Sequence, residues 1–123
     1  MKSPYILLAA AILLVSAHAL GICFGWYETT GWYDTFTHFL GGVWVALALF
    51  HFLKLKKVPL LIAALAAFLL WEGFEFLLAA YIRHAYGVSV GLQPGALDTI
   101  SDIVAGTAGA MTASLSDVFA EKS

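Results

Sequence analysis

The chain has 123 residues, enough for one domain, and a formal net charge of −2. Hydrophobic residues make up 62% of it and charged residues only 11%, a balance that excludes an ordinary water-soluble domain. The basic residues are too few and too scattered for a nucleic-acid-binding surface. We therefore expect one integral membrane domain over residues 1–123, with an all-α fold and the lipid bilayer as its surroundings.

Four segments are long and apolar enough to cross a bilayer as helices, which takes about 20 residues each. The expected spans cover residues 5–24, 34–52, 58–81 and 97–118. The first span also has features of a signal peptide, because Lys2 precedes an apolar run that ends in Ala17-His18-Ala19. We expect an uncleaved helix, since cleavage would leave three spans and put the termini on opposite sides of the membrane.

The loops around the second span predict the orientation. Lys54, Lys56 and Lys57 follow this span, whereas the loop before it contains Glu28 and no basic residue. Because loops rich in lysine and arginine stay in the cytoplasm, the lysine loop should face inward. The expected fold is thus a four-helix membrane bundle with both termini cytoplasmic.

Five acidic residues lie in or at the ends of the expected spans. An ionised side chain there costs at least about 2.5 kcal/mol unless it is paired or hydrated. Residues three or four positions apart share one face of a helix, so three of the spans each present a polar pair. These pairs are Asp34 with His38, Glu72 with Glu75, and Asp98 with Asp102.

The expected topology places all three pairs in the outer half of the bundle. Asp34 and Asp98 begin their spans at the outer face, so His38 and Asp102 lie about 6 Å deeper at the helical rise per residue. The two glutamates lie roughly 9 and 14 Å below the outer end of the third span. The acids should therefore form one cluster.

His18 is a further candidate for this cluster. It lies about 9 Å below the outer end of the first span by the same calculation. A histidine inside a span has two interpretations, because it can ligate a metal ion or can simply hydrogen-bond a backbone carbonyl or a carboxylate. Both remain open for His18.

Five carboxylates in one small space repel one another, so protons or bound cations must neutralise most of them. Carboxylates with one or two imidazoles suit divalent Zn, Mn, Mg or Fe. Because Cys23 is the only cysteine in the sequence, a metal site built from several cysteine thiolates is excluded. One ion and two ions are both compatible with the residues. The expected metal ligands are Asp34, His38, Glu72, Glu75, Asp98, Asp102 and His18, and the expected catalytic residues are Asp98 and Glu72.

Two glycine-containing parts of the sequence predict helix packing and a loop rather than a chemical site. Small residues across 105–110, together with Gly41 and Gly42, favour close helix packing. Residues 82–96 are interrupted by glycine and proline and should not continue a span, so they are either an ordinary surface loop or a cap over the acids. As a cap, they would make Gly91, Gln93 and Gly95 substrate contacts.

The polar pairs also carry a family resemblance. The motifs are Tyr33-Asp34-x-x-x-His38-Phe39, then Glu72-x-x-Glu75, then Asp98-x-x-x-Asp102 with Gly109-Ala110 behind it. In this order they resemble the YjdF-like inner-membrane proteins and, more distantly, the VanZ-like family. The resemblance implies a multi-pass protein of the cytoplasmic membrane of a prokaryote with a shared polar motif, and it implies no established reaction.

The leading functional hypothesis is a metal-dependent hydrolase or transferase that acts on a lipid or lipid-linked substrate from the outer leaflet. The first alternative is a proton or cation transporter or channel element that uses the same acids and forms a homo-oligomer. The second alternative is a noncatalytic membrane assembly or ligand-binding subunit, in which the acids hold the helices together.

Overall fold

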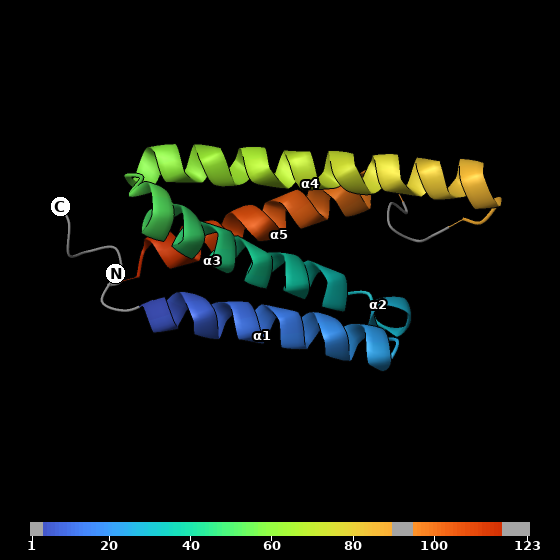
Figure 1. The fold of residues 1–123 in the computed structure, drawn as a ribbon, viewed down its shortest axis with the longest axis horizontal. Helices are drawn as coiled ribbons and strands as arrows, with labels where there is room; N and C mark the ends of the chain where they lie inside the picture. Colours follow the sequence, from blue (N-terminus) through green and yellow to red (C-terminus); the bar gives the residue numbers. More distant parts are fainter. Residues whose placement is uncertain (1–3, 90–94, 117–123) are drawn as a thin grey trace.

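The computed structural model describes residues 4–89 and 95–116, and these residues form five α-helices and no strand. Four of the helices are long and run alongside one another (Figure 1). The helices, in chain order, are α1 (Pro4–Cys23), α2 (Trp26–Thr29), α3 (Tyr33–Leu53), α4 (Lys57–Tyr86) and α5 (Ala96–Ser114).

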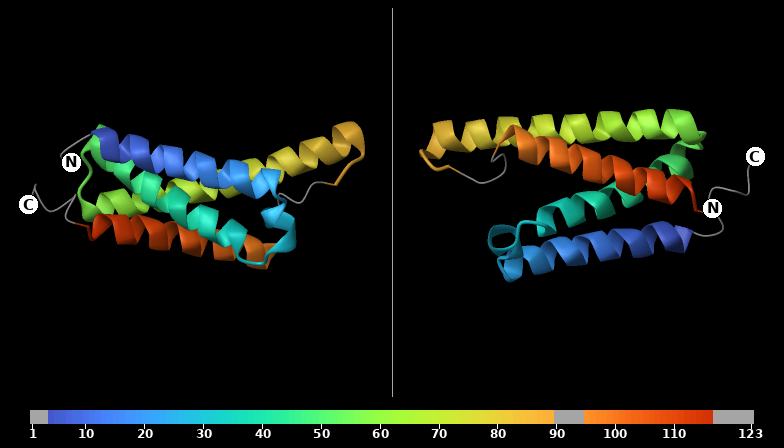
Figure 2. Two further views of the ribbon diagram at one scale, coloured as in Figure 1. Left: turned by 90° about the horizontal axis from the view of Figure 1, so that it is seen from below. Right: turned by 180° about the vertical axis from the view of Figure 1, so that it is seen from behind.

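Successive long helices alternate in direction, as Figures 1 and 2 show. The start of α1, the turn from α3 to α4 and the end of α5 lie at one end of the bundle. The short α2, the start of α3 and the start of α5 lie at the other end. This arrangement brings the beginning of α3 and the beginning of α5 together, as the predicted clustering of the acids requires.

Within the described part of the chain, three helices are long and apolar enough to cross a membrane, namely α1, α3 and α4. Large apolar side chains are exposed along them, such as Leu13 on α1, Phe52 on α3 and Leu70 on α4, which is the surface that a bilayer covers. The fourth predicted span corresponds to α5, which has 19 residues and a length of roughly 28 Å. It is less apolar because it carries two aspartates and many small residues, and its membrane crossing stays a prediction.

Helix α4 continues five residues past the predicted end of its span, to Tyr86. Nothing in residues 82–86 interrupts a helix, and Gly87 then ends it in the left-handed conformation (φ 65) that glycine adopts without strain. Residues 90–94 of the predicted cap, including Gly91 and Gln93, lie outside the described residues. At 30 residues, or about 45 Å, α4 projects beyond α5 (Figure 1).

Helices α3 and α5 approach each other through glycine. A Cβ atom at Gly42 would collide with the carbonyl oxygen of Gly106, and one at Gly109 would collide with the carbonyl oxygen of Phe39. This confirms the predicted close packing at Gly42 and Gly109, where backbone is in contact with backbone. The prediction was wrong for Gly41, whose Cβ position meets no atom of the described residues. Glycine at these positions sets the distance between the two helices that carry His38 and Asp102.

The apolar core fills the half of the bundle near the turn from α3 to α4. It contains Phe50 of α3, Leu60 and Phe68 of α4, and Ala110 of α5. The other half, toward α2, contains the acidic side chains instead. The chain therefore divides its interior into an apolar half and a polar half.

Candidate metal centre

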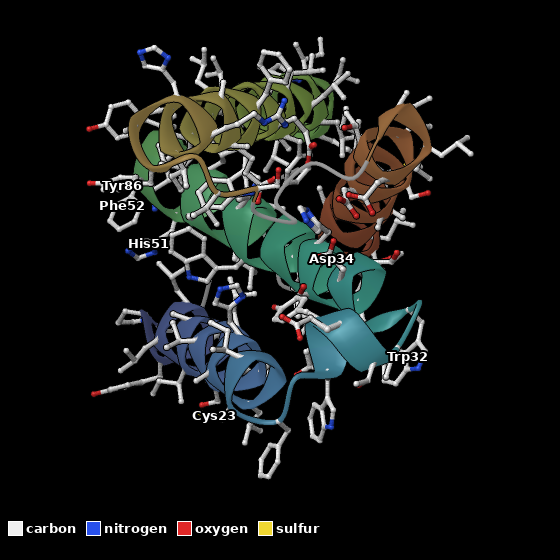
Figure 3. The ribbon with its side chains drawn as sticks, turned by 90° about the vertical axis from the view of Figure 1, so that its right-hand side faces the viewer. Cys23, Trp32, Asp34, His51, Phe52 and Tyr86 are labelled. Atoms are coloured by element: carbon white, nitrogen blue, oxygen red, sulfur yellow. The ribbon has the colours of Figure 1, made fainter. Side chains whose placement is uncertain are left out.

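The polar half of the bundle is centred on His38. Its Nε2 atom lies 3.5 Å from Oδ1 of Asp34, one turn earlier on α3, and 3.4 Å from Oδ2 of Asp102 on α5. Figure 3 shows Asp34 on the side of α3 that faces away from Cys23 of α1. The spacing of four residues on α3 and the close α3–α5 packing together bring one imidazole between two carboxylates.

Asp102 is the most buried carboxylate of the cluster. Only 3% of the residue is exposed, and its Oδ1 atom is buried without a hydrogen-bond partner among the described residues. Leaving a buried charged oxygen unsatisfied is costly, and such groups normally have a protein, water or ion partner. Trp44 Nε1 and Thr107 Oγ1 are also buried and unsatisfied, but these groups are neutral and cost less to bury.

Helix α4 adds the two glutamates. His38, Glu72 and Glu75 each offer a ligand atom such that all three atoms lie within 4.8 Å of one another, and Asp34, His38 and Asp102 do the same. Two ligand atoms on opposite sides of a metal ion are separated by about 4.0–4.6 Å, twice a bond length of about 2.0–2.3 Å. The limit of 4.8 Å is close to this separation, so each group has about the size of the ligand set of a single ion.

Both groups contain His38, so the five residues form one continuous set that we call the acidic cluster: Asp34, His38, Glu72, Glu75 and Asp102. These donors come from three helices and comprise four carboxylates with one imidazole. Oxygen donors with a single nitrogen donor suit hard and borderline divalent ions. All five were expected from the sequence to be ligands, and the structure brings them together.

Asp98 lies outside both groups, at the rim of the cluster. It is half-buried on the first turn of α5, close enough to Asp34 and Asp102 to interact with their charges. It also lines an open cavity of about 530 Å³ with Gly31 and Thr35. This position fits a base facing the cavity better than a ligand, although both roles were expected from the sequence.

His18 belongs to neither group and makes a different contact. Its Nδ1 atom lies 2.6 Å from the hydroxyl oxygen of Tyr27 on α2. Thr37, a neighbour of Tyr27 on α3, donates its hydroxyl proton to the backbone oxygen of Asp34, 2.8 Å away. One of the two groups, the His18 ring nitrogen or the Tyr27 hydroxyl, is the donor of this short hydrogen bond.

The chain of contacts from His18 to Thr37 supports the start of α3 from outside the cluster. Burial raises the pKa of Tyr27 above its ordinary value, so the hydroxyl keeps its proton at neutral pH and remains a donor. A second tyrosine, Tyr33, donates from its hydroxyl to the backbone oxygen of Ala17, 2.5 Å away. Together these contacts attach α1 and α2 to the first turns of α3.

Sequence reasoning did not assign these tyrosines to the site. The aromatic residues around α2 are typical of a membrane interface, and that interpretation hides their hydrogen bonds. The sequence feature that accompanies these contacts is Gly21 of α1. In the structure, a Cβ atom at this position would collide with the rings of Tyr27 and Tyr33. A small residue facing two tyrosines indicates that the rings pack onto α1.

Comparison with known proteins now gives the family. The model of the predicted membrane protein family DUF2238 matches residues 2–123. The chain belongs to this family. Membership confirms the expected kinship with uncharacterised, YjdF-like membrane proteins, and it agrees with the three apolar helices. No curated protein and no solved structure matches the chain, so the family gives a membrane location and leaves the reaction to be argued from the site.

Proposed function

We propose that this DUF2238 member binds a divalent metal ion with the acidic cluster. The observation that carries the proposal is the environment of Asp102. One oxygen of this buried carboxylate lies 3.4 Å from His38 Nε2, and the other has no hydrogen-bond partner in the described part of the chain. A cation satisfies that oxygen and also offsets the mutual repulsion of the neighbouring carboxylates.

A purely structural role for the cluster accounts less well for these contacts. A buried polar network stabilises a bundle when every member is satisfied, and a partly satisfied network is worse than an apolar core. The unsatisfied Oδ1 of Asp102 lies in a cluster whose other members are mostly carboxylates, which cannot donate a hydrogen bond when ionised. Such an arrangement favours an ion as the missing partner.

The reaction that we propose is hydrolysis or group transfer on a lipid or lipid-linked substrate. A divalent ion bound by acidic and imidazole ligands supplies an activated water and polarises a substrate oxygen. The residues of the acidic cluster, Asp34, His38, Glu72, Glu75 and Asp102, would hold the ion. Asp98, at the rim, and Glu72, which lines a second opening, are placed to take up or deliver a proton at their carboxylate oxygens.

Metal analysis of the purified protein tests this proposal. We expect about one divalent ion per chain after purification in detergent without chelator. His38→Ala should lose it, because the residue belongs to both ligand groups, and the loss should exceed the 10–100-fold effect typical of changing an outer-shell partner. His51→Ala is the matched control, since His51 lies in the last turn of the same helix.

Two outcomes of the metal analysis would contradict the proposal. A native protein that carries no stoichiometric metal, and takes up none when zinc, manganese, magnesium or iron is supplied, would refute the metal centre. Equal loss of metal from His38→Ala and His51→Ala would place the ion elsewhere.

A further inference from the structure

A groove opens on the side of the bundle between α4 and α5. Its volume is about 540 Å³, within the range of small-molecule sites. Its lining includes Glu72, Gly73 and Phe76 of α4, and Ala96, Thr99 and Ile100 of α5. The groove therefore joins a carboxylate of the acidic cluster to the outer surface of the two helices.

Small residues keep the groove open. Among the described residues, no heavy atom lies within 4 Å of the place that a Cβ atom of Gly73 would occupy, and Ala96 of α5 also lines the groove. The rim is apolar, with Phe76 62% and Ile100 57% exposed. On a helix that is long and apolar enough to cross a membrane, such a rim faces acyl chains.

The buried end of the groove has the opposite character. Glu72 is only 6% exposed, and it shares a ligand group with His38 and Glu75. A molecule in this groove has its apolar part against Phe76 and Ile100 and its polar part toward Glu72. That combination describes a lipid with one acyl chain in the groove.

The charges near the groove select the kind of lipid. The described lining of both openings contains carboxylates, Glu72 in the groove and Asp98 in the cavity beside it, and no lysine or arginine. This lining offers no cationic side chain to pair with the charge of a phosphate headgroup. An uncharged headgroup needs no such partner, and its hydroxyl can donate to a carboxylate.

We propose that the α4–α5 groove binds an acyl chain of a neutral glycerolipid of the diacylglycerol type, with its free hydroxyl group directed toward Glu72. The role of this lipid as a substrate rests on the proposed metal function. Binding of the acyl chain depends only on the shape and apolarity of the groove.

Photocrosslinking tests the groove directly. The probe is a diacylglycerol with a diazirine in one acyl chain, added to the full-length protein in detergent micelles and mapped by peptide mass spectrometry. We expect crosslinks at Phe76 and Ile100. Gly73→Leu should reduce them about tenfold, which corresponds to a tenfold weaker binding constant, because the new side chain fills the groove.

Two controls distinguish the groove from general contact with lipid. Ala66→Leu adds a side chain to an exposed position on α4, two turns from Gly73 on the same face, and should leave crosslinking unchanged. Gly73→Ala tests for effects of helix propensity. Crosslinking that is spread along α4 and insensitive to Gly73→Leu would overturn the groove.

Competition identifies the headgroup. Unlabelled dioleoylglycerol should displace the probe at concentrations at which dioleoylphosphatidate, with the same acyl chains, does not. Equal or better competition by the phosphatidate would overturn the assignment to neutral lipids.

The metal proposal and the groove proposal can be refuted independently of each other. Metal content measured on the same samples should be equal in wild type and Gly73→Leu. Crosslinking that depends on Gly73 in a protein without metal supports the groove and refutes the metal centre. Stoichiometric metal with no such crosslinking supports the centre and refutes the groove.

Discussion

The buried carboxylate of Asp102 affects the stability of the fold in opposite directions without and with a bound ion. Asp102 has only 3% of its surface exposed, and its Oδ2 atom lies 3.4 Å from His38 Nε2. Burying a carboxylate without full compensation destabilises a fold. The same carboxylate becomes stabilising once an ion binds, because a ligand that binds only the folded state stabilises that state.

Asp102→Asn should therefore have opposite effects in the absence and presence of metal. With chelator, the neutral amide should raise the midpoint of thermal unfolding, since it removes a buried negative charge from among like charges. With metal at about 100 times its dissociation constant, the wild type should gain about 2.7 kcal/mol and the variant much less. Differential scanning fluorimetry in detergent measures both midpoints.

Asp98→Asn is the control for Asp102→Asn, because it removes a carboxylate from the same helix at the rim of the cluster and outside both ligand groups. It should retain most of the stabilisation by metal. An equal gain from metal in wild type and Asp102→Asn would contradict a ligand role for Asp102.

The sequence predicted all five members of the cluster, together with Asp98 and His18, which lie outside both ligand groups, because spacing along a helix determines which residues share a face. Asp34 with His38 and Glu72 with Glu75 needed only this rule. The spacing rule could not identify His38 as the residue that belongs to both ligand groups, because this depends on how α3 is rotated relative to α4 and α5. The contact of His18 with Tyr27 was equally hidden, because α2 has only four residues and no periodic pattern.

At the scale of helices, the distance between α3 and α5 is the quantity that the site depends on. Hydropathy predicted the four long helices because an apolar run of about 20 residues matches the thickness of a bilayer. Their lateral spacing follows from glycines in contact with backbone, at Gly42 and Gly109. The sequence does not show which small residues make such contacts, and Gly41 illustrates this, because its Cβ position is open.

Gly42→Ala should separate α3 from α5 and weaken the site together with the fold. The added methyl group meets the carbonyl oxygen of Gly106, and overpacking of this kind typically costs about 1–3 kcal/mol. We expect a lower free energy of unfolding in a denaturing detergent titration and weaker metal binding. Gly41→Ala, the neighbouring change with no atom in its way, should do neither.

The Gly42 result would contradict the packing account if both alanine variants behaved alike. If Gly42→Ala loses metal binding while its free energy of unfolding is unchanged, Gly42 contributes to the metal site itself and not only to the helix spacing. The measured free energies therefore separate a spacing role from a ligand-binding role.

At the scale of the whole molecule, the described helix ends agree with an even number of membrane crossings. The start of α1 and the end of α5 lie at the same end of the bundle as the lysine-containing turn between α3 and α4 (Figure 2). The acidic cluster lies in the opposite half. The positive-inside rule predicts that the lysine turn faces the cytoplasm and that the site opens outward.

Cysteine accessibility in intact cells tests this orientation. With Cys23 replaced by serine, Glu28→Cys on the exposed surface of α2 and Lys56→Cys in the exposed turn each supply one thiol at opposite ends of the bundle. A membrane-impermeant maleimide should label the Glu28→Cys protein in intact cells and the Lys56→Cys protein only after the membrane is opened. The reverse pattern would turn the site toward the cytoplasm, and labelling of both in intact cells would show that α3 does not separate the two ends across the membrane. Because a lipid substrate must then come from the labelled leaflet, this experiment also determines the side on which the diacylglycerol probe should be offered in vesicles.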